Sequence, residues 1–215
     1  VLLMKTAIVI GSTGLVGTQL ISQLLEISNY SEVISLVRRE SGIEHPKLTE
    51  HVVDFDKPNS WKDLVKGDVL FSTMGTTIKV AGSRANQFKV DYTYQYETAR
   101  IASENGVPVY VLVSSAGATA KSFVFYSRIK GKLEDDVNEL PFKTVQILQP
   151  GPLDGDRKED RKAEKQSLKF IYVLNKIGLF RKYRPIQGSE VARFMIAVAE
   201  KPNSGVYKLD ELFNP

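Results

Sequence analysis

The chain contains no cysteine, which excludes disulfides, thiol nucleophiles and cysteine-ligated zinc. It has only two histidines, His45 and His51, which we interpret as surface residues, so we expect no metal site. No apolar run approaches the roughly 20 residues that a membrane helix needs. The first apolar residues, Val1 to Met4, are too few for a signal peptide. These absences predict a cytoplasmic protein with no membrane partner.

The composition is typical of a globular protein, with 215 residues, 42% hydrophobic and 25% charged. We expect one domain over residues 1–215, with a cofactor-binding core at 5–150 and a substrate-side region at 151–215. The net charge of +4 and the pI near 9.1 could indicate nucleic-acid binding. However, the densest charge cluster, residues 157–165, mixes both signs as a solvated helix face does, so we expect no nucleic-acid partner.

Short apolar runs alternate with segments of helical periodicity along the chain. This alternation predicts an α/β fold with a doubly wound parallel sheet, the Rossmann fold, followed by a small C-terminal extension on the substrate side. The expected strands are residues 5–10, 33–37, 51–55, 69–72, 109–114, 144–148 and 206–209. The expected helices are a first one through Val16 to Leu25 and then residues 61–65, 85–105, 127–139 and 189–200.

Three glycines, Gly11, Gly14 and Gly17, lie where the first expected strand passes into the first helix. Such a turn presents backbone N–H groups and a helix N-terminus to an anionic pyrophosphate. We expect Gly11 to permit the turn, Gly14 to let phosphates approach, and Gly17 to let the helix pack on the strand. The GxxGxxG spacing alone fits an ordinary loop equally well, and its position between strand and helix favours dinucleotide binding.

The second expected strand ends with Arg38 and Arg39, where this fold reads the adenosine ribose. A carboxylate at that point favours NAD, whereas guanidinium groups suit the 2′-phosphate of NADP. An exposed basic pair with no ligand is the alternative. The sequence therefore favours NADP(H) as cofactor.

Tyr126 and Lys130 are four residues apart on an expected helix, so they share one face. A nearby ammonium stabilises a phenolate, which allows such a tyrosine to exchange a proton with a carbonyl or alcohol. Ser115, at the end of the fifth strand, could bind the same oxygen, although the adjacent Ser114 is an alternative. Chance predicts about one YxxxK match in this chain, and Tyr172 forms a second one, which we interpret as packing.

Several motifs together resemble the atypical short-chain dehydrogenases/reductases, and more narrowly the Tat-interacting oxidoreductase family with its bacterial relatives. They are spread in order over residues 11–157 and read GSTGLVG, LVRR, VVDFD, MGTT, SSAGA, YSRIKGKLE and PGPLDGDR. The resemblance implies catalysis by Ser115, Tyr126 and Lys130. It implies cofactor contacts from the glycine turn and from residues that follow later strands, namely Gly11, Thr13, Gly14, Leu15, Val16, Gly17, Arg38, Arg39, Asp54, Met74, Gly75, Tyr126, Lys130, Leu153 and Arg157.

One departure concerns Gln149, which stands where members of that family usually carry arginine before Pro-Gly. Our main prediction is an NADPH-dependent oxidoreductase that acts on a small carbonyl or alcohol. One alternative is a regulator that binds NADP(H) as a redox signal and contacts a protein partner. The other is an isomerase or epimerase that uses its nicotinamide transiently.

Overall fold

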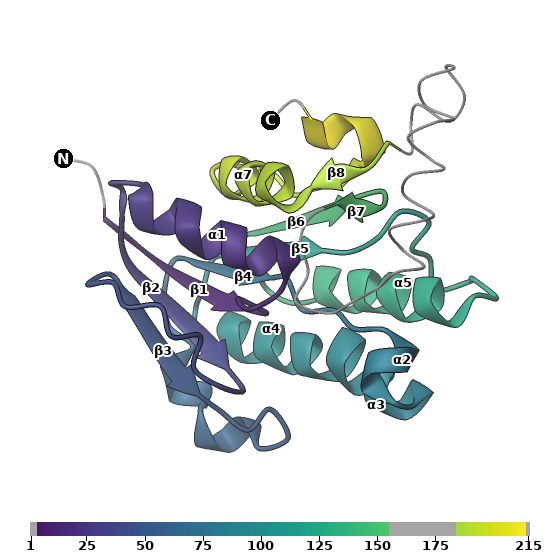
Figure 1. The fold of residues 1–215 in the computed structure, drawn as a ribbon, viewed down its shortest axis with the longest axis horizontal. Helices are drawn as coiled ribbons and strands as arrows, with labels where there is room; N and C mark the ends of the chain where they lie inside the picture. Colours follow the sequence, from purple (N-terminus) through teal and green to yellow (C-terminus); the bar gives the residue numbers. More distant parts are fainter. Residues whose placement is uncertain (1–3, 155–183, 214–215) are drawn as a thin grey trace.

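The computed structural model describes residues 4–154 and 184–213. In these parts, one parallel sheet has the strand order β3-β2-β1-β4-β5-β6-β9 (Figure 1). Its strands are β1 (Lys5–Ile10), β2 (Tyr30–Val37), β3 (Leu48–Val52), β4 (Val69–Ser72), β5 (Val109–Val113), β6 (Thr144–Gln149) and β9 (Gly205–Lys208). The predicted doubly wound α/β fold is confirmed.

The strand order reverses between β1 and β4, because the chain returns from the β3 edge to the other side of β1. Ligands of doubly wound sheets bind beyond the carboxyl ends of the strands at such a point. Here the two ends are joined, because the Thr73 hydroxyl donates to the carbonyl oxygens of Ile10 and Gly11, both at 3.0 Å. The sheet therefore places the glycine turn beside the segment that follows β4.

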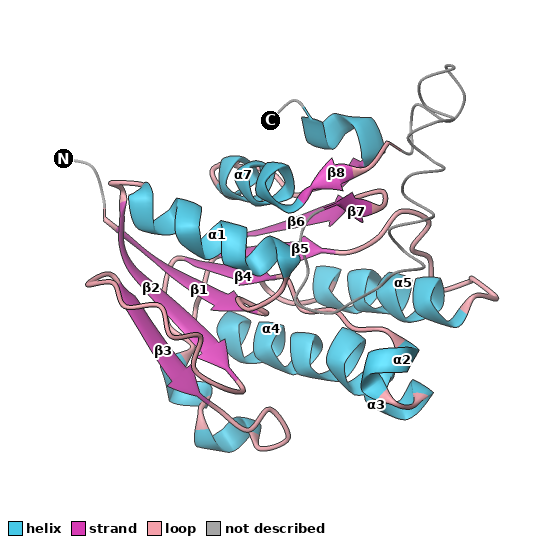
Figure 2. Ribbon diagram, in the orientation of Figure 1, coloured by secondary structure: helices cyan, strands magenta, loops and turns pink. Residues whose placement is uncertain are grey.

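Helices cover both faces of the sheet (Figures 1 and 2). The helices α1 (Leu15–Glu26) and α7 (Gly188–Ala199) lie on one face, and α4 (Tyr94–Glu104) and α5 (Phe125–Asn138) on the other. Strand β1 is buried from both sides: Ala7 and Val9 pack in one core, and Ile8 and Ile10 in the other. This two-sided burial explains the continuous apolar run.

The helix expected at 85–105 is broken into pieces. It comprises α3 (Arg84–Phe88), a π-helical turn (Lys89–Thr93) and α4, and the short helix α2 (Ile78–Ala81) precedes them. A π turn inserts one extra residue into the helical path and is frequent at functional sites. This one turns Asp91 inward, where it is completely buried.

The expected strand at 51–55 lies three residues too late in the chain. Strand β3 ends at Val52, and the buried Phe55 instead packs against Trp61, with ring centroids 5.7 Å apart. Its apolar character therefore serves the core rather than the sheet edge. The helix expected at 61–65 is a pair of 3₁₀ turns, Pro58–Ser60 and Lys62–Leu64.

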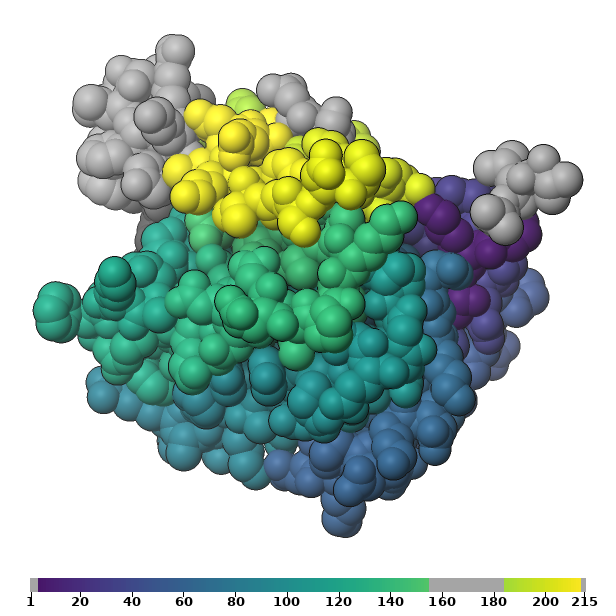
Figure 3. Space-filling model, turned by 180° about the vertical axis from the view of Figure 1, so that it is seen from behind, coloured from purple at the N-terminus to yellow at the C-terminus, as the bar shows by residue number. Residues whose placement is uncertain are grey.

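The C-terminal part is joined to the cofactor core more closely than we expected. Strand β9 extends the main sheet beside β6, and Figure 3 shows the last residues packed over the green part of the chain. A second, two-stranded sheet pairs β7 (Leu153–Asp154) with β8 (Ile186–Gln187), which leads directly into α7. At the start of α7, a Cβ on Gly188 would lie 2.7 Å from the carbonyl oxygen of Leu15.

Candidate functional site

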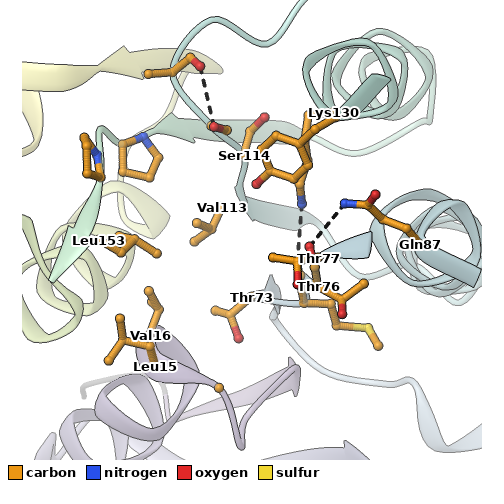
Figure 4. Close-up of a pocket in the computed structure, with 18 of the residues that line it drawn as sticks. Leu15, Val16, Thr73, Thr76, Thr77, Gln87, Val113, Ser114, Lys130 and Leu153 are labelled. Carbon is orange, nitrogen blue, oxygen red and sulfur yellow. Dashed lines mark hydrogen bonds between the residues drawn. The ribbon is translucent and has the colours of Figure 1, made fainter. Parts of the chain in front are cut away.

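A cleft opens at the carboxyl ends of β1, β4 and β5 and has two lobes. The larger lobe has a volume of about 1020 Å³ and the smaller about 520 Å³. Figure 4 shows the larger one, with Leu15, Val16 and Leu153 facing Thr76, Gln87 and Lys130 across it. The two lobes share the residues Thr13, Gly14, Thr73, Met74, Gly75 and Thr76. The cleft therefore continues across the glycine turn.

The three glycines differ in what their backbones require. Gly11 has a φ of +79°, and a Cβ there would lie 2.6 Å from the backbone nitrogen of Met74. A Cβ on Gly17 would lie 2.1 Å from the carbonyl oxygen of Gly11. Gly17 therefore lets the helix approach the glycine turn closely, rather than the strand as expected. Gly14 has φ −82° and ψ 176°, an extended conformation open to any residue. Its Cβ would approach only the carbonyl oxygens of Gly11, at 3.3 Å, and Thr73, at 4.0 Å.

This difference gives a prediction for Gly14→Val. The backbone accepts a branched residue, so the variant should fold, but its side chain would occupy the space where a pyrophosphate approaches the N–H groups. We expect NADPH to raise the Tm of the wild-type protein and to leave that of Gly14→Val unchanged. Gly17→Val is the contrasting variant, which should fail to fold. If NADPH raised the Tm of Gly14→Val as much as that of the wild-type protein, the phosphate site would be contradicted.

Tyr126 and Lys130 both line the larger lobe, as their spacing on one helix requires. Tyr126 lies in the first turn of α5 and is 36% exposed, so its side chain is reachable from the cleft. Lys130 lies one turn further into the protein and is only 2% exposed. The pair therefore combines an accessible phenol with a buried ammonium.

The two adjacent serines after β5 have different partners. Ser114 is buried and donates its hydroxyl to the carboxylate of Glu134. Among the described residues, the Ser115 hydroxyl has a single hydrogen-bond contact, at 3.5 Å, with the carbonyl oxygen of Ala116. Because Ser114 is already engaged, Ser115 is the serine with a hydroxyl available to a ligand in the larger lobe.

Asp91 is the partner of Lys130. Its Oδ1 atom lies 3.1 Å from the Lys130 Nζ atom, and the two side chains are 0% and 2% exposed. Within the part of the chain that the structure describes, Oδ1 has no well-aligned hydrogen-bond donor, so its contact with Lys130 is primarily an ion pair. Burial lowers the pKa of Lys130, but the charges of Asp91 and then Tyr126 outweigh it, so that the pKa is raised overall. The backbone N–H of Thr76 contacts Oδ2 at 3.3 Å, which ties Asp91 to the cleft wall.

Glu134 forms a second buried polar group behind the site. Burial raises the pKa of this carboxyl, although its hydrogen bonds to Ser114 and Gln149 oppose the effect. The Gln149 amide donates to both carboxylate oxygens, at 3.0 and 2.8 Å. Gln149, which replaces the arginine expected from the resemblance, thus binds Glu134 through a neutral donor.

The smaller lobe is lined by two of the three residues expected at the adenosine end. Arg38 and Asp54 both line it, whereas Arg39 is exposed beside it and does not. The Asp54 carboxylate also pairs with Lys57 at 3.1 Å. Leu153 lines the larger lobe through β7. Arg157, Tyr172 and Lys176 lie outside the described residues.

Sequence reasoning missed Asp91 and Glu134. Asp91 lies inside a segment of helical periodicity, where an acidic residue is normally assigned to the solvated face. The π turn that buries it has no marked composition. Glu134 did carry a signal, because it follows Lys130 by four residues and therefore shares its helix face.

Comparison with known sequences identifies the relatives. A family model described as HIM1 matches residues 36–184. The mitochondrial protein FMP52 of Meyerozyma guilliermondii is 36% identical over 202 residues, covering 91% of this chain and 86% of the relative. FMP52 of Candida albicans is 34% identical over 206 residues, covering 93% and 90%. The resemblance to the Tat-interacting oxidoreductases stays a prediction.

Comparison with solved structures shows the fold. The Bordetella bronchiseptica enzyme WbmH, solved with NAD⁺, matches with a TM-score of 0.72 at 15% identity, covering 95% of this chain and 76% of that one. The UDP-glucose 4-epimerase of Thermotoga maritima, solved with UDP-glucose, matches at 0.70 and 15%, covering 97% and 80%. A short-chain dehydrogenase family protein of Francisella tularensis matches at 0.67 and 16%, covering 94% and 96%.

These findings correct one expectation. The relatives are named mitochondrial, so the cytoplasmic location expected from the composition is wrong. That expectation rested on absent segments, which do not specify a compartment. Within residues 4–154 and 184–213, no helix has the length and hydrophobicity needed to cross a membrane. The same residues contain no group of three or more side chains arranged to hold a metal ion.

Proposed function

The chain belongs to the HIM1 family, and from its cleft we propose that it is an NADP(H)-dependent oxidoreductase that reduces a carbonyl or oxidises the corresponding alcohol. The observation that carries this proposal is the placement of Ser115, Tyr126 and Lys130 in one lobe of a cleft whose floor is the glycine turn. A protein that only bound a nucleotide would not need an accessible phenol beside a buried ammonium.

The cleft suits a dinucleotide in its shape. Gly14 lines both lobes, and the lobes on either side of it have room for the two halves of the cofactor. We propose that Thr13, Gly14, Leu15 and Val16 hold the pyrophosphate. Arg38 and Asp54 would lie at the adenosine half, and Met74 and Leu153 at the nicotinamide half.

Each catalytic side chain has one role in this proposal. The nicotinamide, when bound, supplies the hydride that the carbonyl carbon accepts. Tyr126 donates its proton to the carbonyl oxygen, and in the reverse direction it accepts one from the alcohol. Ser115 holds that oxygen by a hydrogen bond. The Lys130 ammonium stabilises the phenolate that Tyr126 becomes after donating its proton.

Asp91 has a positioning role in the same proposal. A lone ammonium as deeply buried as Lys130 would tend to lose its proton. The Asp91 carboxylate at 3.1 Å keeps it charged and fixes its distance from Tyr126. Lys130 also donates to the carbonyl oxygen of Met74 at 3.4 Å, so its Nζ atom lies at the wall where the nicotinamide ribose would bind.

The choice of NADP over NAD rests on the smaller lobe. Arg38 and Arg39 make no ion pair within the described residues, so both guanidinium groups are free to meet a 2′-phosphate. Charge-assisted bonds of this type contribute roughly 1.5–3 kcal/mol each, so NADPH should bind about tenfold or more tightly than NADH. Calorimetry would measure both Kd values. Because Arg38 lines the lobe and Arg39 does not, Arg38→Ala should remove most of the preference and Arg39→Ala less. Equal Kd values in the wild-type protein would contradict this assignment.

The experiment that tests the proposed function follows NADPH absorbance while a panel of aldehydes and ketones is offered. Net oxidation of NADPH that requires a carbonyl identifies an oxidoreductase. An isomerase would convert its substrate without net change in NADPH, and a redox sensor would bind NADPH without converting anything. The names of the relatives support a mitochondrial location, which fractionation of cells would test.

A further inference from the structure

The surface beside the larger lobe combines exposed apolar side chains with cations. We call this surface the mouth patch; Ile78 and Lys79 belong to it and line the lobe, and its other members, outside the lining, are Arg84, Phe123, Val124 and Arg128. Phe123 is 101% exposed, Val124 62% and Ile78 45%, which is unusual for large apolar residues. They come from two segments far apart in sequence, α2 with α3 and the approach to α5.

Contacts hold these two segments side by side. The Arg84 guanidinium of α3 lies 5.4 Å from the centroid of the Phe125 ring at the start of α5, and Arg128 lies 5.9 Å from the same ring. Arg128 also donates to the carbonyl oxygens of Ser122 and Phe123, at 2.9 and 3.3 Å. The approach to α5 is therefore fixed next to α3, and Ile78, Lys79 and Tyr126 continue the patch into the lobe.

The charge of the mouth patch has one sign. No aspartate or glutamate occurs in residues 69–90 or 105–133, which include both segments. Lys79, Arg84 and Arg128 are exposed and form no ion pair with any residue of the two described ranges. Among the described residues that line the lobe, the only other charged side chain is Lys130, which Asp91 neutralises. The patch therefore attracts an anion.

This anion need not be the cofactor. The pyrophosphate would lie at the glycine turn, and Figure 4 shows Leu15 and Val16 of that turn across the lobe from Thr76, Thr77 and Gln87. Lys79 follows Thr77 on α2 and so belongs to the side opposite the turn. Ile78, Lys79 and Tyr126 line the same lobe, so a ligand that enters from this side passes the mouth patch on its way to Tyr126.

We propose that the substrate is an amphiphilic oxo-carboxylate, with an apolar chain between the reacting carbonyl and the carboxylate; this inference rests on the proposed function. Its carbonyl lies at Tyr126 and Ser115, where the carbon takes a hydride from NADPH and the oxygen takes the Tyr126 proton to give the hydroxy acid. Its chain lies along Ile78, Phe123 and Val124. Its carboxylate meets Lys79 and Arg128 at the surface.

The test uses three probes, 9-oxodecanoate, its methyl ester and the short oxo acid levulinate. Calorimetry gives their Kd values for the protein saturated with NADP⁺, and NADPH oxidation gives kcat/KM. Two half-exposed ion pairs should favour the acid over its ester by about five- to tenfold. The additional methylenes should favour 9-oxodecanoate over levulinate by more than about tenfold.

Variants separate the two contributions. Lys79→Gln combined with Arg128→Gln should remove the preference for acid over ester and keep the effect of chain length. Phe123→Ser combined with Ile78→Ser should do the reverse. Lys143→Gln and Val206→Ser are matched controls, because these exposed residues lie directly before β6 and on β9, away from the mouth patch, and neither should change any Kd.

The outcomes distinguish this inference from the proposed function. Equal affinity for acid and ester, or a preference for the acid that the Lys79/Arg128 variant retains, overturns the substrate assignment. In that case, reduction of any ketone would still support the proposed oxidoreductase activity. A preference in binding without reduction of any carbonyl overturns the oxidoreductase and leaves the patch as a binding site. Equal binding of acid and ester, together with patch-dependent binding to phosphatidylcholine vesicles containing phosphatidylglycerol, would assign the patch to a lipid surface and overturn the inference.

Discussion

Tyr126→Phe should lower the rate of carbonyl reduction by about 10²–10⁴-fold, the usual contribution of a positioned general acid. The substitution removes one oxygen from a side chain that is 36% exposed, so neither the fold nor the Kd for NADPH should change appreciably. The measurements are kcat by NADPH absorbance and Kd by calorimetry. Together they separate loss of proton transfer from loss of cofactor.

The chain supplies its own control for this variant. Tyr172 and Lys176 repeat the same spacing, and the sequence assigns them no part in the site. Tyr172→Phe should therefore retain wild-type turnover. Full activity in Tyr126→Phe, or inactivity confined to Tyr172→Phe, would show that the proton donor has been assigned incorrectly.

Among the substitutions that should still allow folding, Asp91→Ala should have the largest effect on stability. Removing one partner of a buried ion pair leaves the other charge uncompensated, which typically costs about 3–5 kcal/mol. Lys130 is 2% exposed, and among the described residues it forms an ion pair with no carboxylate other than that of Asp91. Urea unfolding at neutral pH would measure the loss.

The pH dependence of this loss identifies its cause. In the wild-type protein the pKa of Lys130 is raised, so the stability that the pair provides is complete at neutral pH and declines only as the pH rises through that raised pKa. In Asp91→Asn, which keeps the shape, burial alone lowers the pKa of Lys130. Its stability deficit should therefore be greatest at neutral pH and should shrink as the pH rises toward the raised pKa of the wild-type lysine, above which the lysine is neutral in the folded and unfolded states of both proteins.

A purely structural ion pair would also show that pH profile, so activity provides the second readout. If Asp91 keeps Lys130 charged for catalysis, Asp91→Asn should lower kcat at neutral pH more than it raises KM, and Asp91→Glu should restore part of it. Unchanged kcat in a folded Asp91→Asn protein would confine Asp91 to a structural role.

The sequence predicted the parts of the site that depend on chain-local patterns. The glycine turn follows a buried strand, Tyr126 and Lys130 share a helix face, and Arg38 comes directly after the second strand; these relations involve neighbours in sequence. Asp91 could not be assigned in this way, because its burial depends on a π turn and on a lysine 39 residues later. Phe55 misled the strand prediction for a similar reason, since its partner Trp61 is a tertiary contact.

Ser115 shows how the two sources of information complement each other. The sequence has two adjacent serines after β5, and its pattern favoured Ser115 but did not decide which hydroxyl faces the site. The structure distinguishes them by a contact across the core, since Glu134 of α5 engages Ser114. A choice that depended on register in the sequence becomes a choice between an engaged and a free hydroxyl.

The short pairing of Leu153 with Ile186 has a consequence for how this protein can diversify. It clamps together two points of the chain that are 33 residues apart, and on the far side Gly188 packs against Leu15 beside the glycine turn. Once two points of a chain are clamped, the entropy cost of the closure grows only slowly with the number of residues between them. Insertions, deletions or exchanges between the clamped ends would thus change the stability of the cofactor-binding half only slightly. Relatives could acquire new substrate preferences through this interval while inheriting an unchanged nucleotide site.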